Sequence, residues 1–566
     1  MDDSLDNFSP QTAGWFRRAF PQGPTPTQVQ AWPAIRTGGD ALIISPTGSG
    51  KTLAAFLWAI DEFMTKPRHF RKPGVAVLYI SPMKALGTDV ARNLQAPLEG
   101  IAEQFAQQGR KAPKVRTGIR TGDTDARGRR ALAAHPPDIL VTTPESLYLM
   151  LTSKTASTLK NVQTVIVDEI HVLAGNKRGA HLALSLERLD DLVGGPVQRI
   201  GLSATVRPPE QVARFLGGSR PVSLIQPKSA TAMDLRLIEP LEDMGDLAAP
   251  PGESDQEGQD GDQRSGSIWP AVERAILDQV LSHRATLVFV NSRGLAERLT
   301  ARLNDLHQSD LQASGHDRPG LSDETDEPRE PAHYDSATGS TSERTSGLSV
   351  DQPIAMAHHG SVSKERRRQV EDDLKAGRLR CVVATSSLEL GIDMGSVDLV
   401  IQVNAPLSTA SGLQRVGRAD HQVGRVSQAR LFPLTREQIL ECTASMESMV
   451  QGDIEPTIMP SSPLDVLAQQ TVAAAAMGPL KEEDWLATVR RAAPFAHLDR
   501  QVYRAVLGML SGAYTSQDFT AFRPILVWDH QTGTLTARPG AQRLAVTSGG
   551  TIPDRGSYSV VMPSEA

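Results

Sequence analysis

The sequence predicts an α/β protein with two tandem parallel-sheet domains, followed by a mostly helical domain. Three observations lead to this prediction. Short β-branched runs alternate with helical stretches from residue 41 to 205, and a second series of this kind extends from 285 to 434. An acidic stretch separates the two series. From about residue 436 the pattern changes to helices that are followed by short strand-like pieces.

The strand-like runs have the continuous apolar character of strands that are covered by helices on both faces of a parallel sheet. In the first series they are ALIIS (41–45), VAVLYIS (75–81), KVRTGI (114–119), DILVTT (138–143), TVIVDE (164–169) and QRIGLSAT (198–205). In the second series they are ATLVFVNS (285–292), CVVATS (381–386), DLVIQVN (398–404) and ARLFPL (429–434).

Length and composition exclude several classes of protein. A chain of 566 residues is too long for one core. The acidic N-terminus MDDSLDNFSP has no apolar core and is therefore no secretory signal. No stretch approaches the roughly 18 apolar residues of a membrane span. The two cysteines, Cys381 and Cys442, make no disulfide framework and no structural zinc site. We therefore expect a cytoplasmic protein.

The net charge of −6 is unevenly distributed along the chain. Residues 240–264 carry −7 and residues 306–350 carry −6, so the other residues together carry +7. Both stretches are rich in Gly, Pro, Ser and Asp and poor in apolar residues, which is typical of disordered insertions. The mildly basic remainder permits an anionic partner.

The segment SPTGSGKT (45–52) follows one strand-like run and opens a helical stretch. Ser45 replaces the first Gly of the strict P-loop pattern, but the Gly-rich turn is retained. Backbone N–H groups of Gly48, Ser49 and Gly50 would cradle a phosphate at the helix N-terminus. Lys51 would reach the β- and γ-phosphate oxygens, and the hydroxyl of Thr52 would bind Mg²⁺. The alternative is a Gly/Ser turn with an incidental lysine.

The segment VDEIHVL (167–173) places two carboxylates at the end of another apolar strand. Asp168 would bind Mg²⁺, and Glu169 would orient and deprotonate the attacking water. Strand ends meet at one edge of an open parallel sheet, so the pair would lie beside the P-loop. Alternatively, the two acids only end the strand.

These residues resemble the superfamily 2 helicases, and further segments match that superfamily in order. The resemblance implies that Gln28, in GPTPTQVQAW, reads adenine, and that an aromatic ring (Phe20, or Trp15 or Phe16) covers it. It implies that Gly391 and Asp393, in VATSSLELGIDMG, contact the nucleotide. It also implies ATP and Mg²⁺ as cofactors.

In the second half, QRVGRADH places Arg415 and Arg418 three residues apart, on one face of a helical turn. Both guanidinium groups would point at the γ-phosphate across a cleft between the domains, where arginine stabilises transition-state charge. The alternative is an exposed arginine pair. By resemblance, His171, Ser203 and Thr205 couple hydrolysis to movement.

The resemblance also implies contacts with the backbone of a nucleic acid. They fall on loops with hydroxyls, backbone N–H groups and cations, which bind phosphates without reading bases. In the first half these residues are Lys84, Thr121, Gly122, Asp123 and Thr143; in the second they are Ser292, Arg293, His359, Thr385 and Ser386. The basic run that begins at Lys364 is interpreted as a solvated helix face.

The DEIH box and the segments SPMKAL, RTGDT, TTPESL and ELGIDMGSVDLV are most similar to the large helicase-related (Lhr) family of DNA helicases. That family has two RecA-like domains, then a winged helix and a further domain. We therefore expect RecA-like domains at 1–232 and 233–435, a winged helix at 436–530, and the start of a truncated domain at 531–566.

The resemblance implies an ATP-dependent helicase that moves 3′ to 5′ on single-stranded DNA and unwinds DNA or RNA:DNA duplexes in repair, associated with the nucleoid. Two alternatives stay open. One is an RNA helicase or remodeller of the same superfamily. The other is a nucleic-acid-binding protein with a vestigial ATPase, against which the intact Lys51, Glu169 and arginine pair argue.

Overall fold

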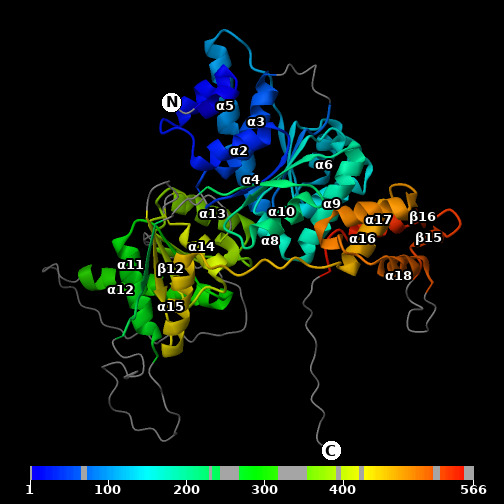
Figure 1. Cartoon of the computed structure of the whole chain (residues 1–566). Helices are drawn as coiled ribbons and strands as arrows, with labels where there is room; N and C mark the ends of the chain where they lie inside the picture. The colour runs from blue at the N-terminus through cyan, green and yellow to red at the C-terminus, as the bar shows by residue number, and fades with distance from the viewer. Residues whose placement is uncertain are drawn as a thin grey trace, which may run out of the picture.

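The computed structural model describes residues 3–46, 48–65, 73–227, 232–241, 267–315, 353–389, 395, 397–419, 426–513 and 523–552. In Figure 1 the first α/β domain is blue to cyan, the second is green to yellow, and a smaller orange domain lies against the first. Among the described residues, no helix is both long and apolar enough to cross a membrane.

The first domain, called domain 1 below, contains a seven-stranded parallel sheet of order β3-β4-β2-β5-β6-β1-β7. Its strands are β1 (Asp40–Ile44), β2 (Val77–Ile80), β3 (Thr117–Arg120), β4 (Ile139–Thr142), β5 (Thr164–Val167), β6 (Gln198–Ser203) and β7 (Val222–Ile225). The sequence prediction missed β7, an edge strand in which two of the four residues are exposed, because it lacks the continuous apolar character of the others.

Helices cover both faces of this sheet. Along β1, Ala41 and Ile43 enter one hydrophobic core and Leu42 and Ile44 the other, because successive side chains of a strand point to opposite faces. The helices are η1 (Asp3–Asn7), α1 (Pro10–Ala19), α2 (Pro26–Arg36), α3 (Lys51–Thr65), α4 (Lys84–Asn93), α5 (Gln95–Gln107), α6 (Ala126–Ala134), α7 (Pro144–Leu151), η3 (Lys154–Leu159), α8 (Ile170–Ala174), α9 (Lys177–Val193) and α10 (Pro209–Gly217).

The second domain, domain 2, contains a six-stranded parallel sheet of order β10-β11-β9-β12-β13-β8. The two parallel sheets confirm the predicted pair of RecA-like domains. The strands are β8 (Met233–Leu237), β9 (Thr286–Phe289), β10 (Ala355–His358), β11 (Cys381–Ala384), β12 (Leu399–Val403) and β13 (Ser427–Phe432). The helices are α11 (Trp269–Ser282), α12 (Arg293–Gly315), α13 (Lys364–Lys375), η4 (Ser386–Leu388), α14 (Thr409–Val416) and α15 (Arg436–Gln451).

Two features of domain 2 differ from the prediction. Helix α15 buries Cys442 and Met449 in the core of domain 2, although the prediction assigned it to the winged helix. Helix α12 continues to Gly315, ten residues into the predicted second acidic insertion. The extension is supported by Leu306, which packs against the core, and by Asp310, which accepts a hydrogen bond from Arg274 at 2.6 Å. Residues 242–264 and 316–350 of the two acidic stretches lie outside the described residues.

The third domain has helices followed by a small antiparallel sheet of order β14-β16-β15, which confirms the predicted winged-helix fold. Its elements are α16 (Leu464–Ala475), β14 (Leu480–Lys481), α17 (Glu482–Arg491), η5 (Ala493–Phe495), α18 (Arg500–Ser511), β15 (Leu526–Asp529), β16 (Thr534–Ala537) and α19 (Ala541–Thr547). The prediction assigned residues from 531 onward to a separate domain. However, β16 lies between β14 and β15, and α19 buries Ala541 and Ala545 in the same core.

The winged-helix domain is joined to domain 1 by a continuous core and a buried polar contact between α9 and α16. The side chain of Gln470 is fully buried. It accepts a hydrogen bond from Arg188 at 2.8 Å and donates to the backbone oxygen of His181 and to Ser185, both at 3.0 Å. Every polar atom of this amide therefore contributes to the contact between the two domains.

We expect Gln470→Ala to lower the free energy of unfolding by about 2–3 kcal/mol, because it leaves a buried guanidinium group without this acceptor. Urea denaturation would measure the loss. Gln501→Ala, in the same domain but exposed, is the matched control and should change stability by less than about 0.5 kcal/mol. Equal midpoints for the two variants would contradict the assigned role of Gln470.

Candidate nucleotide and nucleic-acid site

The Gly-rich turn after β1 has the backbone of a phosphate-binding loop. Gly48 and Gly50 have φ of 78° and 81°, the left-handed region that glycine adopts readily. A Cβ at Gly50 would also lie only 2.6 Å from Nε2 of Gln28. Helix α3 begins at Lys51, whose Nζ donates to the backbone oxygens of Ser45 (2.5 Å) and Pro46 (2.7 Å). The lysine therefore lies over the loop, next to the half-buried Thr52.

The predicted adenine segment lies against this loop. Gln28 is 3% exposed; its Oε1 accepts from the backbone N–H of Thr25 at 3.0 Å, and its Nε2 donates to the oxygen of Gly50 at 3.4 Å. In this structure the amide thus caps α2 and contacts the phosphate loop. Of the three candidate rings, Trp15 and Phe16 are buried, whereas Phe20 is 41% exposed and is the ring that could cover a base.

The acidic pair lies at the carboxyl end of β5, as expected for a strand end in a parallel sheet. Asp168 accepts a hydrogen bond from the buried hydroxyl of Tyr79 and another from the backbone N–H of Glu169 at 2.9 Å. Glu169 has φ 43° and ψ 44°, a left-handed conformation that is unusual for a residue with a side chain. Strain of this kind is common at functional sites.

Electrostatics link this pair to the phosphate loop. Burial and the neighbouring Glu169 carboxylate raise the pKa of Asp168. Burial lowers the pKa of Lys51, and the two carboxylates oppose that shift. Two neighbouring buried acids beside a lysine suit a divalent cation. Among the described residues no cluster of three or more His, Cys, Asp or Glu could hold a metal by itself. Thr52 and Asp168 remain the candidate ligands, which fits Mg²⁺ shared with phosphate and water.

His171 connects three elements of the site. Its Nδ1 lies 3.3 Å from Oγ of Ser203 and 3.6 Å from Oε2 of Glu169, and its Nε2 accepts from Nε2 of Gln414 at 2.7 Å. Burial, followed by the charge of Lys51, lowers the pKa of His171 to about 4, so the imidazole is neutral at neutral pH. Since Gln414 donates to Nε2, the ring proton belongs on Nδ1.

Of the predicted coupling residues, the structure therefore places His171 and Ser203 in contact, whereas Thr205 is exposed on the following bend.

The two predicted arginines converge on Glu389. Arg415 donates to its carboxylate at 2.9 and 3.2 Å and to Oε1 of Gln402 at 2.7 Å. Arg418 lies in the turn after α14 and donates to the backbone oxygen of Glu389 at 2.9 Å. The positive charge of Arg418 is one of the causes that lower the pKa of Lys51. The charge of Arg418 therefore acts on Lys51 of the phosphate loop, although the two residues belong to different domains.

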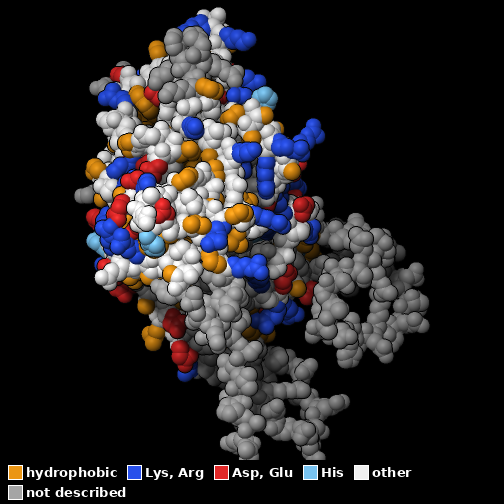
Figure 2. Space-filling view, turned by 90° about the vertical axis from the view of Figure 1, so that its right-hand side faces the viewer, with side chains coloured by type: hydrophobic (Ala, Val, Ile, Leu, Met, Phe, Trp, Pro, Cys, Tyr) orange, Lys and Arg blue, Asp and Glu red, His pale blue; other side chains and the backbone are white. Residues whose placement is uncertain are grey.

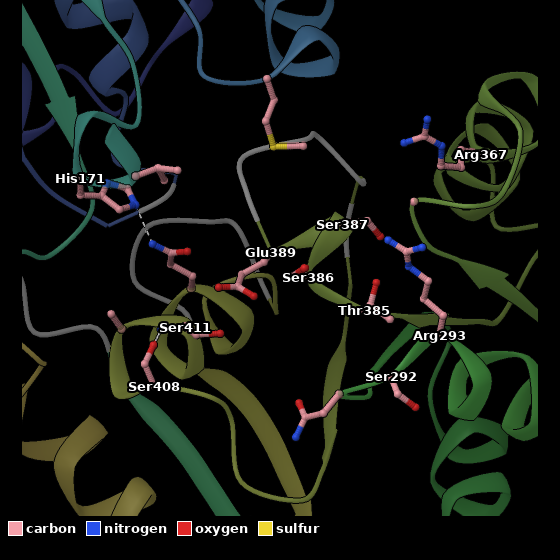
Figure 3. A pocket seen from close by; sticks show the side chains of 16 residues that line it. His171, Ser292, Arg293, Arg367, Thr385, Ser386, Ser387, Glu389, Ser408 and Ser411 are labelled. Carbon is pink, nitrogen blue, oxygen red and sulfur yellow. Dashed lines mark hydrogen bonds between the residues drawn. The ribbon is translucent and has the colours of Figure 1, made fainter. Parts of the chain in front are cut away.

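A cleft of about 690 Å³ separates the two α/β domains. Figure 3 shows His171 and Glu389 with Ser408 and Ser411 in one part of it, and Ser292, Arg293, Thr385 and Ser386 in another. The dashed line in that view is the hydrogen bond that joins His171 of domain 1 to domain 2. Four of the predicted nucleic-acid contacts thus share one cleft with His171.

The other predicted nucleic-acid residues are arranged differently. Lys84 and Lys364 both pair with Asp123, at 2.5 and 3.3 Å, so Lys364 contacts domain 1, although we interpreted its run as a solvated helix face. Thr121 and Thr143 are buried, and their hydroxyls accept from the backbone N–H groups of their own turns. Gly122 lies beside the lysine, since a Cβ there would be 3.3 Å from Nζ of Lys84.

His359 is buried and hydrogen-bonded to Glu297 at 2.6 Å. Gly391 and Asp393, the predicted nucleotide contacts, lie outside the described residues. Three site residues were missed from the sequence, namely Tyr79, Glu389 and Gln414. Gln414 directly precedes Arg415 in QRVGR, so a polar residue one place before a predicted arginine was the available signal.

Two RecA-like domains, one with a phosphate loop and an acidic box and the other with paired arginines, define a superfamily 2 helicase core. Family models agree with this class. The DEAD/DEAH box helicase model matches residues 25–214, and the helicase conserved C-terminal domain matches 342–422. The model of the winged-helix domain of the large helicase-related protein matches 447–566.

The chain belongs to the large helicase-related (Lhr) family. It is 56% identical over 564 residues to the Lhr helicase/uracil glycosylase of Escherichia coli (strain K12). The matched region covers 99% of this chain and 36% of that relative. It is 36% identical over 559 residues to the ATP-dependent helicase Lhr-Core of Methanothermobacter thermautotrophicus, which covers 97% of this chain and 58% of the relative.

Among solved structures, the Mycobacterium smegmatis helicase Lhr bound to ssDNA and AMP-PNP is similar, with a TM-score of 0.82 and 52% identity. The match covers 100% of this chain and 64% of that one. The chain thus spans about a third of the length of the Escherichia coli relative and less than two thirds of the other two proteins.

Proposed function

We propose that this chain is an ATP-driven motor that moves along single-stranded DNA and unwinds duplexes in the 3′ to 5′ direction. One observation carries the proposal: His171, which lies beside Glu169 in domain 1, bonds to Gln414 of domain 2, and the charge of Arg418 in the same domain acts on Lys51. An ATP-binding site divided between two domains allows hydrolysis to change the distance between those domains.

Each group of the site has a role in hydrolysis. Lys51 would exchange its two loop carbonyls for phosphate oxygens, and Glu169 would hold and deprotonate the attacking water. Arg415 and Arg418 would leave Glu389 for the γ-phosphate as the cleft closes. Mg²⁺, held by Thr52 and Asp168, would supply positive charge against the phosphates. Gln28, with Phe20 over the ring, would select adenine.

The strand would lie along the cleft, bound through its backbone by Arg293, Thr385 and Ser386 together with the turns of domain 1. Lys and Arg side chains gather over the right half of the face in Figure 2, which favours an anionic partner. The similar Mycobacterium smegmatis helicase Lhr is bound to ssDNA in its solved structure, which supports DNA as the tracking strand. Polarity, action on RNA:DNA duplexes and a role in repair follow from the family resemblance.

An ATPase assay with and without single-stranded DNA or RNA, coupled to displacement from 3′- or 5′-tailed duplexes, tests the proposal. We expect hydrolysis that depends on DNA and opening of 3′-tailed substrates, with binding that weakens as salt rises. If no strand stimulates hydrolysis, the motor proposal fails. Opening of only 5′-tailed substrates would refute the polarity, and activity on RNA alone would refute the choice of DNA.

We expect His171→Ala to uncouple unwinding from hydrolysis, because it removes the contact that joins the acidic box, Ser203 and Gln414. Coupling contacts of this kind contribute about 0.5–2 kcal/mol, so strand displacement per ATP should fall by roughly 2- to 30-fold. Parallel assays of both activities would measure the ratio. An equal loss of both would count against coupling. His135→Ala, an exposed histidine of domain 1, should leave the ratio unchanged.

A further inference from the structure

The segment Asp453–Ile458, called the strap below, connects domain 2 to the winged-helix domain. In Figure 1 the yellow-orange chain runs from the second domain to α16 along the underside of domain 1. The segment has no helix or strand of its own. Its course is set by contacts with both α/β domains.

Contacts with domain 1 are made at two turns that directly follow parts of the site. The backbone N–H of Thr457 donates to the oxygen of Arg207 at 2.7 Å, and the Arg207 side chain pairs with Asp453. Arg207 lies two residues after the GLSAT segment. Gly175 is the C-cap of α8 and follows the DEIH box by four residues. The backbone oxygen of Ile458 lies 3.6 Å from the place that a Cβ would take at this glycine.

Contacts with domain 2 are made at the first turn of α14. Glu455 Oε1 accepts from the N–H of Thr409 at 2.6 Å, and Oε2 accepts from the N–H of Ala410 at 3.2 Å. Ser408 accepts from the next N–H, that of Ser411, at 3.1 Å. The first-turn N–H groups are thus satisfied, and a carboxylate faces the positive end of the helix dipole.

Helix α14 is the element that carries Gln414 and Arg415. Although partial burial acts in the opposite direction, the N–H groups of Thr409 and Ala410 hold the pKa of Glu455 below its ordinary value, which keeps the carboxylate charged. The helix is therefore attached to domain 1 at two places: directly through Gln414 and His171, and at its other end through the strap.

We propose that Glu455 is a positioning residue that holds α14 so that its arginine meets the ATP site. This inference rests on the proposed function. Glu455 would act through the helix whose first turn it caps. The strap thereby connects the winged-helix domain, which shares a hydrophobic core with domain 1, with the arginine helix of domain 2.

Steady-state ATPase kinetics at saturating single-stranded DNA would test the proposal. We expect Glu455→Ala to lower kcat about fivefold, the factor that corresponds to the roughly 1 kcal/mol by which a lost cap destabilises a helix, and to change KM for ATP less than twofold. Glu455→Gln keeps one acceptor oxygen, so its kcat should lie between those of the wild type and Glu455→Ala. Glu447→Ala is the matched control, because this carboxylate of α15 accepts from Gln451 at 3.0 Å and, within the described part of the chain, caps no helix. It should behave like the wild type.

A double-mutant cycle separates positioning from general stability. In the Arg415→Ala background, Glu455→Ala should cause no further loss of kcat, because the arginine through which it acts is absent. Hydrogen exchange at the backbone N–H groups of Thr409 and Ala410 should be faster in Glu455→Ala than in the wild type, and unchanged in Glu447→Ala.

A kcat within 1.5-fold of an active wild type, or the same loss in both backgrounds, would overturn the inference and leave the motor proposal standing. A wild-type chain that hydrolyses no ATP with any strand would overturn both.

Discussion

Replacing Glu169 with glutamine is expected to lower kcat for ATP hydrolysis about 10³-fold, within the range that a general base contributes. Glutamine keeps the size of the side chain and the hydrogen bonds of its oxygen but cannot take a proton. Binding of ATP should persist, because Lys51 and the loop around Gly48 and Gly50 are unchanged. The variant should therefore hold ATP and nucleic acid without turnover.

Rapid-quench hydrolysis and equilibrium binding of a fluorescent ATP analogue would measure the two effects separately. Glu99→Gln, an exposed carboxylate on α5, serves as the matched control and should keep wild-type kcat. A Glu169→Gln enzyme with more than about a tenth of wild-type kcat would assign the base elsewhere.

Loss of the arginines has the second large effect. Arg418→Ala is expected to lower kcat about 10³-fold, because the arginine across the cleft stabilises charge that develops on the transferred phosphate. Arg418→Lys should recover only part of this rate, because an ammonium group has no planar fork. KM for ATP should change much less than kcat, since Lys51 and the loop around Gly48 and Gly50, which hold the phosphates in domain 1, are unchanged.

The two arginines should differ in their effect on stability. Both are fully buried, but Arg415 pairs with the Glu389 carboxylate and Gln402, whereas Arg418 bonds to the backbone oxygen of Glu389. Arg415→Ala therefore leaves a largely buried carboxylate without this partner and should cost about 3 kcal/mol in unfolding free energy. Denaturation curves and kcat values for both variants test this. Arg284→Ala, with a side chain that is 91% exposed, is the control. Wild-type kcat in Arg418→Ala would refute its role at the phosphate.

The phosphate loop and the acidic box could be predicted because each is a short, contiguous segment attached to an apolar strand. The strand, the turn and the helix that place Lys51, and the strand that places Asp168, all lie within a few residues of those positions in the chain. A parallel sheet then brings the two strand ends to one edge, whatever the rest of the chain does.

Contacts between distant segments could not be predicted in this way. Gln414 and His171 are 243 positions apart in the chain, and their hydrogen bond exists only because the two domains face each other. Glu389 lies in the segment in which the resemblance pointed to Gly391 and Asp393 as nucleotide contacts. In the structure, Glu389 accepts hydrogen bonds from Arg415 and Arg418. Tyr79 looked like one more apolar residue of a buried strand, but its hydroxyl meets Asp168.

Domain limits show the same division. The change of pattern near residue 436 was visible, but α15 packs back onto domain 2, because Cys442 and Met449 fit its core. Residues 534–537 form a strand only because β14 and β15 offer hydrogen bonds on either side. An isolated four-residue segment has no such partner, and its local pattern is weak.

By itself, then, the amino-acid sequence determined which residues can bind phosphate, hold a metal or take a proton, because those abilities depend on side-chain chemistry and on neighbours along the chain. The tertiary structure alone decided which of these groups meet across the cleft, that the winged-helix domain is joined to domain 1, and that the strap reaches α14. These contacts arise from the packing of surfaces that are hundreds of residues apart, and no local pattern records that packing.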